Sequence, residues 1–263
     1  MRHSEDNGTV HALAARELVY QVDAARLLDE VSLSAEEGEF VGLIGPNGAG
    51  KSTFIKLLTG QLQPTVGGVR VLGIDVGKNA RKVKANVGIV PESESPPSYL
   101  TAAEYLEFVA RLRGLDDVDG KVRHWLDWFG INDKRDSMCK DLSKGQRQKV
   151  MLAGALIHKP KLLFLDEPFV NLDPIYQRKC RELLMEMIAD GGTIFLCTHI
   201  LEVAERLCTR VAVIDHGHVL ASGTIDELRE SPGETLEDVF IRLVGGSVSP
   251  VEAADGGLPD EEE

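Results

Sequence analysis

Apolar and polar positions follow two different periods along the first ninety residues of this chain. Short apolar runs at 19–22, 31–33 and 40–44, separated by polar turns such as 36–38, predict β-strands. After residue 50 the apolar spacing becomes helical through Phe54, Ile55, Leu57 and Leu58, and this helix is expected to end between 60 and 64. Further strands are expected at 69–72 and 87–90.

The pattern from 101 to about 156 is helical. Thr101 and Glu104 have the spacing of a capping box, and they precede the apolar residues of a helix that Gly114 is expected to terminate. Amphipathic runs follow at 122–129 and at 145–156. The middle of the chain is therefore predicted to contain three helices.

Strand and helix alternate in the second half. Strands are predicted at 162–165, 193–197 and 211–214, with helices at 175–188 and 201–207 between them. This alternation is typical of an α/β fold with a parallel, helix-covered sheet. A last helix at 235–244 begins at the cap Thr235, and the residues after 246 lack apolar periodicity. We expect a flexible N-terminus at 1–10, a folded domain at 11–246 and a disordered acidic tail at 247–263.

Composition narrows the class of protein. The chain has 263 residues, of which 43% are hydrophobic, so full disorder is excluded. Of its net charge of −13, six charges lie in 247–263 and one in 1–10, so the remaining body carries −6. An acidic body without a Lys/Arg block lacks the charge pattern of a free-standing nucleic-acid binder. No nucleic-acid partner is therefore expected.

The sequence also indicates a compartment. No apolar stretch approaches the roughly 20 residues of a membrane-spanning helix, and the N-terminus has no apolar signal core. The four cysteines are scattered without a CxxC pair, so neither a zinc site nor a disulfide framework is indicated. We expect a soluble, cytoplasmic chain with reduced thiols.

A phosphate-binding loop is predicted between the strand at 40–44 and the helix that follows it. The motif GxxxxGK[ST] is matched in the strand–loop–helix context that it requires. Backbone N–H groups of such a loop wrap an anion, and the helix N-terminus adds partial positive charge. Lys51 is expected to pair with the β- and γ-phosphates, and Ser52 to ligate Mg²⁺. The candidate nucleotide-binding residues are Gly45, Pro46, Asn47, Gly48, Ala49, Gly50, Lys51, Ser52 and Thr53.

Two carboxylates follow the apolar strand at 162–165. In α/β sheets the carboxyl ends of the strands form the ligand-binding edge, so Asp166 and Glu167 are expected near the phosphate loop. Asp166 is predicted to hold Mg²⁺, directly or through water. Glu167 is predicted to orient and deprotonate the attacking water as a general base.

Three further motifs complete a family resemblance. Leu142-Ser143-Lys144-Gly145-Gln146 resembles the LSGGQ signature of ABC ATPases, Asn171-Leu172-Asp173-Pro174 resembles their D-loop, and His199 their switch histidine. Tyr20 resembles the aromatic residue that stacks on adenine. All but about ten N-terminal and seventeen C-terminal residues follow the family's order of motifs.

The resemblance implies a P-loop NTPase of the ABC ATPase class, with a RecA-like core, an N-terminal antiparallel β-subdomain and an inserted helical subdomain at about 93–158. It implies ATP and Mg²⁺ as cofactors and a dimer with two composite sites. In each of these sites, ATP on one subunit's phosphate loop is contacted by four residues of the other subunit: Ser143, Gly145, Gln146 and Asp173. The resemblance also implies that His199 contacts the γ-phosphate. Without the family resemblance, the residues at 142–146 would be interpreted only as the N-cap of a helix.

Two positions depart from the common family pattern. Glu92 stands where most ABC ATPases carry glutamine, and it is a candidate ligand of Mg²⁺ or of its water. Asn171 replaces the usual glycine of the D-loop, and asparagine tolerates left-handed backbone angles. Glu92, the LSKGQ signature and the ending at 235–240 resemble the drug- and sodium-exporter branch of the ABC-2 type. His216 and His218 look like a turn between two strands, because no third metal ligand is evident.

The leading interpretation is the ATP-hydrolysing subunit of an ABC-2-like exporter. Its implied partners are a second ABC ATPase subunit and integral membrane permease subunits, which place it at the inner face of the cell membrane. A soluble ABC protein acting on ribosomes or DNA is disfavoured by the single cassette and by the 91 positions between Lys51 and Leu142, too few for a long coiled coil. A degenerate regulatory subunit is the third possibility, and Lys51, Asp166, Glu167 and His199 count against it.

Overall fold

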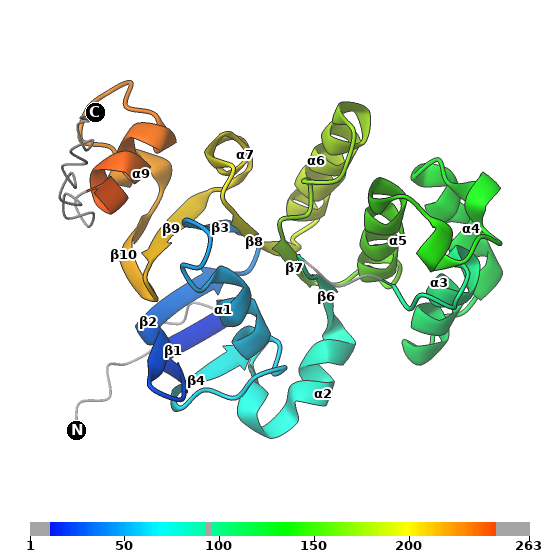
Figure 1. The fold of residues 1–263 in the computed structure, drawn as a ribbon, viewed down its shortest axis with the longest axis horizontal. Helices are drawn as coiled ribbons and strands as arrows, with labels where there is room; N and C mark the ends of the chain where they lie inside the picture. Colours follow the sequence, from blue (N-terminus) through cyan, green and yellow to red (C-terminus); the bar gives the residue numbers. More distant parts are fainter. Residues whose placement is uncertain (1–10, 93–95, 246–263) are drawn as a thin grey trace, which may run out of the picture.

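The computed structural model describes residues 11–92 and 96–245, and it contains two β-sheets and a helical body (Figure 1). The predictions of a flexible N-terminus at 1–10 and of an acidic tail at 247–263 lie outside the described residues. Within the described ranges, every helix is too short or too polar to cross a membrane.

The N-terminal sheet is antiparallel and has the strand order β2-β1-β4-β5. Its first two strands are longer than the apolar runs that predicted them. The strands are β1 (His11–Val22), β2 (Ala25–Glu36), β4 (Val66–Val71) and β5 (Ile74–Asp75).

The core sheet has the strand order β10-β9-β3-β8-β7-β6. Strands β9, β3, β8, β7 and β6 run parallel to their neighbours, which confirms the predicted α/β sheet, and β10 is an antiparallel edge strand. His216 lies in the turn between β9 and β10, as predicted, whereas His218, predicted in the same turn, is the first residue of β10. The strands are β3 (Phe40–Ile44), β6 (Val87–Val90), β7 (Leu162–Asp166), β8 (Thr193–Thr198), β9 (Arg210–Asp215) and β10 (His218–Gly223).

Alternate residues of the core strands enter two separate apolar clusters. On β8, Phe195 and Cys197 pack with α1 (Lys51–Leu58) and the N-terminal sheet, whereas Ile194 and Leu196 pack with α6 (Pro174–Ala189) and α7 (Leu201–Leu207). Helix α1 therefore lies between the two sheets, while α6 and α7 cover the opposite face (Figure 1). Burial on both faces explains why these strands are continuously apolar. Two C-terminal helices, α8 (Ile225–Leu228) and α9 (Leu236–Gly245), pack beside β9 and β10.

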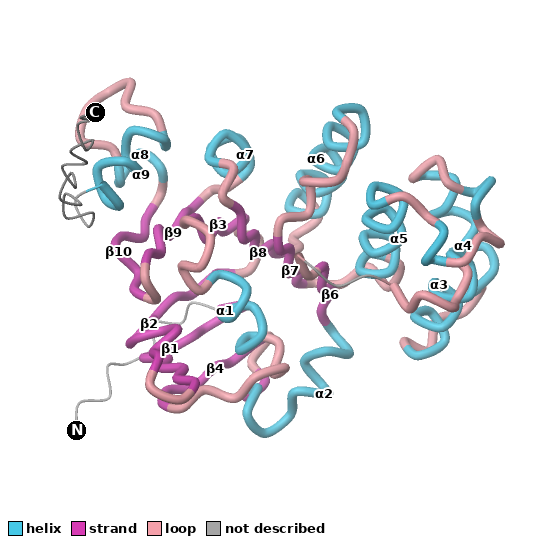
Figure 2. The backbone as a smooth tube through the Cα atoms, viewed as in Figure 1, coloured by secondary structure: helices cyan, strands magenta, loops and turns pink. Residues whose placement is uncertain are grey.

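The helical body is inserted between β6 and β7 and projects from that edge of the core sheet (Figure 2). Its first helix begins with the predicted capping box: the hydroxyl of Thr101 accepts from the N–H of Glu104 at 3.1 Å, and the Glu104 carboxylate accepts from the N–H of Thr101 at 2.8 Å. The elements are α3 (Ala102–Leu112), α4 (Val118–Trp128), η1 (Asn132–Lys134), η2 (Cys139–Asp141) and α5 (Lys144–Leu156).

Two helices are absent from the sequence-based expectation, the four-residue α8 and the longer α2 (Val76–Asn86). Helix α2 connects β5 to β6, and within it only Val76 and Val83 are buried. Its apolar signal is therefore too sparse to show a helical period. The N-cap Asp75, which accepts from the N–H of Lys78 at 3.3 Å, is the local signal that marks its start.

Candidate nucleotide site

The phosphate loop follows β3 and ends where α1 begins. Gly48 and Gly50 have φ angles of +83° and +108°, which side-chain-bearing residues rarely adopt. A Cβ on Gly50 would lie 2.8 Å from Leu28 Cδ2, and one on Gly45 would collide with the carbonyl oxygen of Ile214. Both glycines are thus required by the packing of the loop against β2 and β9.

Lys51 is the first residue of α1 and is only 7% exposed. Its ammonium donates to the carbonyl oxygens of Gly45 at 2.7 Å and Pro46 at 3.0 Å. The charge of Lys51 is therefore held over the concave side of the loop, where an anion would also meet the N-terminus of α1.

Three oxygen-bearing side chains converge beside the loop. The Ser52 hydroxyl donates to Glu92 Oε2 at 3.2 Å, and the same hydroxyl lies close enough to Asp166 to affect the pKa of that carboxylate. Burial raises the pKa of Asp166 to about 6; the Ser52 hydroxyl opposes this, and Glu92 and Glu167 add to it. Asp166 Oδ1 is buried without a hydrogen-bond partner among the described residues. An unpartnered carboxylate oxygen beside a hydroxyl and a second carboxylate is an oxygen donor set that fits Mg²⁺.

Glu167 is held in place by the end of the neighbouring strand. It has a φ angle of +49°, and its N–H donates to the carbonyl oxygen of Cys197 at 3.0 Å. Its carboxylate accepts from the Thr198 hydroxyl at 3.0 Å and from the His199 N–H at 2.8 Å. A third contact joins Oε1 to His199 Nδ1 at 2.7 Å. Because a carboxylate only accepts, His199 carries its proton on Nδ1. The structure thus brings the two predicted catalytic residues into direct contact.

A pocket of about 330 Å³ lies at the phosphate loop, and of the predicted site residues Gly45, Pro46, Ala49 and His199 do not line it. It is lined by Leu27, Asn47, Gly48, Gly50, Lys51, Ser52, Thr53, Glu92 and Glu167. Asp166 is buried beneath it and touches it through Ser52.

Leu27 is a lining residue that the sequence interpretation missed. Tyr20 pairs with Leu28 across β1 and β2, packs against the apolar cluster around α1, and does not line the pocket. The geometry therefore gives adenine stacking by Tyr20 no support. The sequence did contain a signal for an exposed leucine at this place. Leu27 and Leu28 are adjacent on a strand, so only one of the two side chains can face the core.

The second group of predicted residues lies apart from this pocket. Ser143 and Gln146 form a capping box at the start of α5. The Ser143 hydroxyl accepts from the N–H of Gln146 at 3.2 Å, and Gln146 Oε1 accepts from the N–H of Ser143 at 2.9 Å. A Cβ on Gly145 would lie 2.7 Å from the carbonyl oxygen of Asn171. Asp173 caps α6 by accepting from the N–H groups of Ile175 and Tyr176, both at 3.1 Å. One chain therefore carries a phosphate-loop half and a separate signature half.

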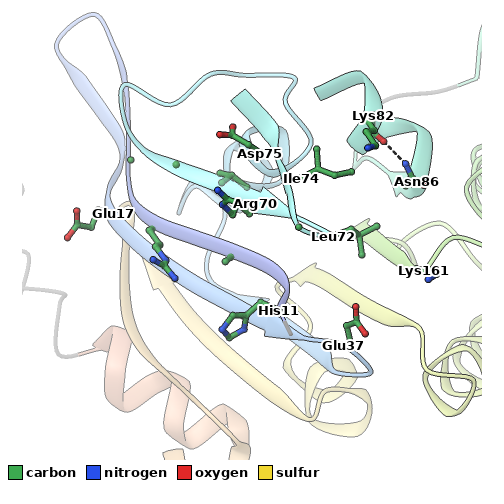
Figure 3. A pocket seen from close by; sticks show the side chains of 16 residues that line it. His11, Glu17, Glu37, Arg70, Leu72, Ile74, Asp75, Lys82, Asn86 and Lys161 are labelled. Atoms are coloured by element: carbon green, nitrogen blue, oxygen red, sulfur yellow. Dashed lines mark hydrogen bonds between the residues drawn. The ribbon is translucent and has the colours of Figure 1, made fainter. Parts of the chain in front are cut away.

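A larger hollow of about 1060 Å³ lies on the outer face of the N-terminal sheet (Figure 3). Side chains such as Arg70, Lys82, Glu37 and Asp75 border it, from β4, α2 and the neighbouring turns. None of the predicted site residues lines this hollow.

The fold and the pocket define a phosphate-loop nucleotide-binding protein. The family model described as "ABC transporter" matches residues 28–170. The daunorubicin/doxorubicin resistance ATP-binding protein DrrA of Streptomyces peucetius is 36% identical over 86% of this chain and 69% of its own length. The Nod factor export ATP-binding protein I of Rhizobium meliloti is 38% identical over 84% of this chain and 66% of its own length.

Solved structures agree with these relatives. An ATP-binding subunit of an ABC transporter superposes with a TM-score of 0.84 at 32% identity, covering 89% of this chain and 99% of that one. A dimeric ATP-binding cassette in a post-hydrolysis state, bound to ADP and Pi, has a TM-score of 0.75 at 25% identity, with 81% and 98% covered. The chain belongs to the ABC transporter family and is an ATP-binding, ATP-hydrolysing subunit.

Proposed function

We propose that this chain hydrolyses ATP in the pocket at the phosphate loop and thereby powers export through a separate membrane permease. The observation that carries the proposal is the convergence of Lys51, Ser52 and Glu167 on one pocket, with Asp166 buried beneath it. The exporter assignment is supported by the printed names of the relatives, which are a drug-resistance and a Nod factor export protein.

In this proposal the loop N–H groups and Lys51 bind the β- and γ-phosphates. Ser52, Asp166 and Glu92 would hold Mg²⁺, which supplies charge neutralisation for the leaving phosphates. Asn47 and Thr53 line the same pocket. The exposed Leu27 offers an apolar surface for the adenine ring of ATP.

Glu167 is proposed as the general base and His199 as its partner. The Thr198 hydroxyl and the His199 N–H fix the carboxylate, so its lone pairs have a set direction toward an attacking water. The His199 ring donates from Nδ1, which leaves its Nε2 as an acceptor in the neutral form. His199 can in this way contact both the base and a phosphate-bound water.

The signature half is proposed to act on ATP bound by a second ABC ATPase subunit. Ser143, Gly145 and Gln146 lie at the N-terminus of α5, where N–H groups and the helix dipole favour an anion. Asp173 is expected at the same interface. Two chains arranged in this way would close two equivalent sites. The structural relative in a dimeric, ADP- and Pi-bound state supports this arrangement.

A permease partner and a place at the inner face of the cell membrane belong to the same proposal. The helical body exposes several apolar side chains, among them Tyr99 at 80% and Leu112 at 71%. An apolar surface on an otherwise acidic chain is suited to contact with another protein.

The test is Mg²⁺-dependent ATP turnover by the purified chain and by two variants. Glu167→Gln is expected to reduce turnover at least 100-fold, as loss of a general base does, while nucleotide affinity stays within about threefold. It is also expected to accumulate an ATP-bound dimer. Lys51→Ala, the matched control, is expected to lose nucleotide binding itself. Turnover by Glu167→Gln at the rate of the unsubstituted chain contradicts the assignment. Absence of Mg²⁺-dependent turnover in the unsubstituted chain contradicts the proposal that this pocket hydrolyses ATP.

A further inference from the structure

Helix α5 contains a lysine whose charge is buried against α6. Lys149 is 9% exposed, and its ammonium lies 3.2 Å from the centroid of the Tyr176 ring and 3.5 Å from Asp173 Oδ2. Burial lowers the pKa of Lys149, and the Asp173 carboxylate opposes that shift. The ammonium is thus satisfied by two groups of the first turn of α6.

The Tyr176 ring also contacts the end of α4. Its ring stacks on Phe129 with centroids 6.5 Å apart and an interplanar angle of 25°. Gly130, with φ +61°, meets the Tyr176 hydroxyl so closely that a Cβ there would collide with it. Residues of α4, α5 and α6 therefore meet around one aromatic ring.

The same face of α5 also holds the loop between β7 and α6. Gln148 Nε2 donates to the carbonyl oxygen of Pro168 at 3.0 Å, and Gly145 packs on the backbone of Asn171. Helix α6 holds the same loop, because Gln177 Nε2 donates to the carbonyl oxygens of Phe169 and Leu172, both at 3.1 Å. This loop begins at Glu167 and ends at Asp173, so it joins the proposed general base to the proposed dimer interface.

We propose that Lys149 is a positioning residue that locks the signature turn and the 168–173 loop into one rigid unit. A second subunit then meets Ser143 and Asp173 at a fixed separation, and ATP-dependent association does not have to order them. This inference rests on the proposed function, because it concerns the same composite site. Lys149 does not line the nucleotide pocket, so ATP binding to a single chain is expected to be independent of it.

The first test uses the full chain with Glu167→Gln, whose dimerisation with ATP is followed by sedimentation. Adding Lys149→Met or Tyr176→Leu is expected to weaken the dimer about tenfold or more, because each removes the contact between α5 and α6. The affinity of the monomer for a fluorescent ATP analogue is expected to change less than twofold. Combining the two substitutions is expected to add little, as for residues that act through one contact.

Conservative variants separate positioning from general damage. Lys149→Arg and Tyr176→Phe keep the cation over the ring and are expected to restore dimerisation. Lys179→Met removes the exposed second ammonium, 5.1 Å from the same ring centroid, and is expected to have no effect. Normal dimerisation by Lys149→Met, or equal damage by Lys179→Met, overturns the inference.

A second measurement does not depend on ATP. Hydrogen exchange of amides at 169–173 in the nucleotide-free chain is expected to accelerate in Lys149→Met and in Tyr176→Leu, but not in Lys179→Met. If Glu167→Gln itself fails to bind ATP or to dimerise, the proposed function fails, and exchange alone then decides the role of Lys149. Unchanged exchange in both Lys149→Met and Tyr176→Leu also overturns the inference.

Discussion

Glu167 combines an unfavourable backbone angle with a carboxylate that accepts from Thr198 and His199. A non-glycine residue at φ +49° carries strain of order 1–3 kcal/mol. Hydrogen bonds with Cys197, Thr198 and His199 hold it there. The carboxylate is therefore positioned by the carboxyl end of β8 and by the residue that follows it. This pre-organisation reduces the reorganisation required when a water is deprotonated.

His158 offers a pH-dependent prediction at the residue scale. Its Nε2 lies 3.2 Å from the carbonyl oxygen of Val87, and burial, with the nearby Arg113, lowers the pKa of His158 to about 4. Between pH 6.5 and 4 the unfolded chain binds a proton that the folded chain does not, so stability falls as the pH falls through this window. Because the ring is partly exposed, we expect a loss of about 1–2 kcal/mol.

The variant His158→Gln keeps a side-chain donor but cannot titrate. Urea unfolding at pH 7 and at pH 4.5 is expected to show a correspondingly smaller loss of stability than in the unsubstituted chain. His124→Gln, at an exposed histidine, serves as the control and is expected to keep the original pH dependence. If both variants and the unsubstituted chain lose the same free energy of unfolding between pH 7 and pH 4.5, the assignment of the pH dependence to His158 is contradicted.

Most residues that form the site could be predicted from the sequence, but most of the contacts between them could not. The order of Lys51, Asp166 and Glu167, and the strand ends that carry them, followed from local patterns. The contact between His199 and Glu167 depends on the parallel pairing of β7 with β8, for which no local signal exists. Tyr20 is proposed from its residue type alone, whereas the register of the β1–β2 hairpin, for which the sequence has no local signal, leaves Leu27 and not Tyr20 at the pocket.

At the scale of elements, prediction succeeded where one local rule dominated. The Thr101 capping box, the buried strands and the turn at His216 were read correctly because each depends on a few adjacent residues. Helix α2 was missed because its sequence is polar and its position is set by packing of Val76 and Val83. The lengths of β1 and β2 are set by their mutual pairing and not by their apolar runs.

The segment from Glu92 to Tyr105 is predicted to couple ATP binding to the permease. Glu92 contacts Ser52 at one end, and the other end enters α3; residues 93–95 lie outside the described ranges. Tyr99 is 80% exposed, whereas the Leu100 carbonyl oxygen accepts from the Cys139 N–H at 2.8 Å. A segment anchored at both ends can convert a small shift at the site into a rigid-body rotation.

Replacing Tyr99 and Leu100 with serine is expected to leave the basal ATPase rate of the isolated subunit within about twofold. Association with the co-purifying permease, measured by pull-down from membranes, is expected to fall at least fivefold because apolar contacts are lost. Phe108→Ser, at an exposed apolar residue of α3 outside this segment, tests whether the effect is confined to the segment. Undiminished association and transport place the coupling surface elsewhere.

At the scale of the whole molecule, the two halves of the proposed site are built by different parts of the fold. The phosphate loop depends on both sheets, whereas the signature turn depends on the helical body and α6. A subunit can thus fold each half correctly and still form no complete site alone.

Removal of residues 247–263 is expected to leave the ATPase rate and the folded yield unchanged within about 30%. The segment is rich in acidic residues and has no apolar period, so it cannot contribute a core. Truncation before Leu236 is the contrasting control, because it deletes Leu236 and Val239, which are buried. That deletion is expected to lower the folded yield. A tail truncation that halves the ATPase rate contradicts the prediction.

The central position of β3 has a consequence for biosynthesis. The strand that precedes the phosphate loop lies between β8 and β9, whose residues are translated about 150 and 170 positions later. A ribosome that has released only the first 190 residues therefore presents the complete phosphate-loop sequence without the strands on which it rests. Nucleotide affinity must arise late in synthesis, after Arg210–Asp215 has left the exit tunnel. The nascent chain cannot be stabilised by ATP before that point, although it already contains Lys51 and Ser52.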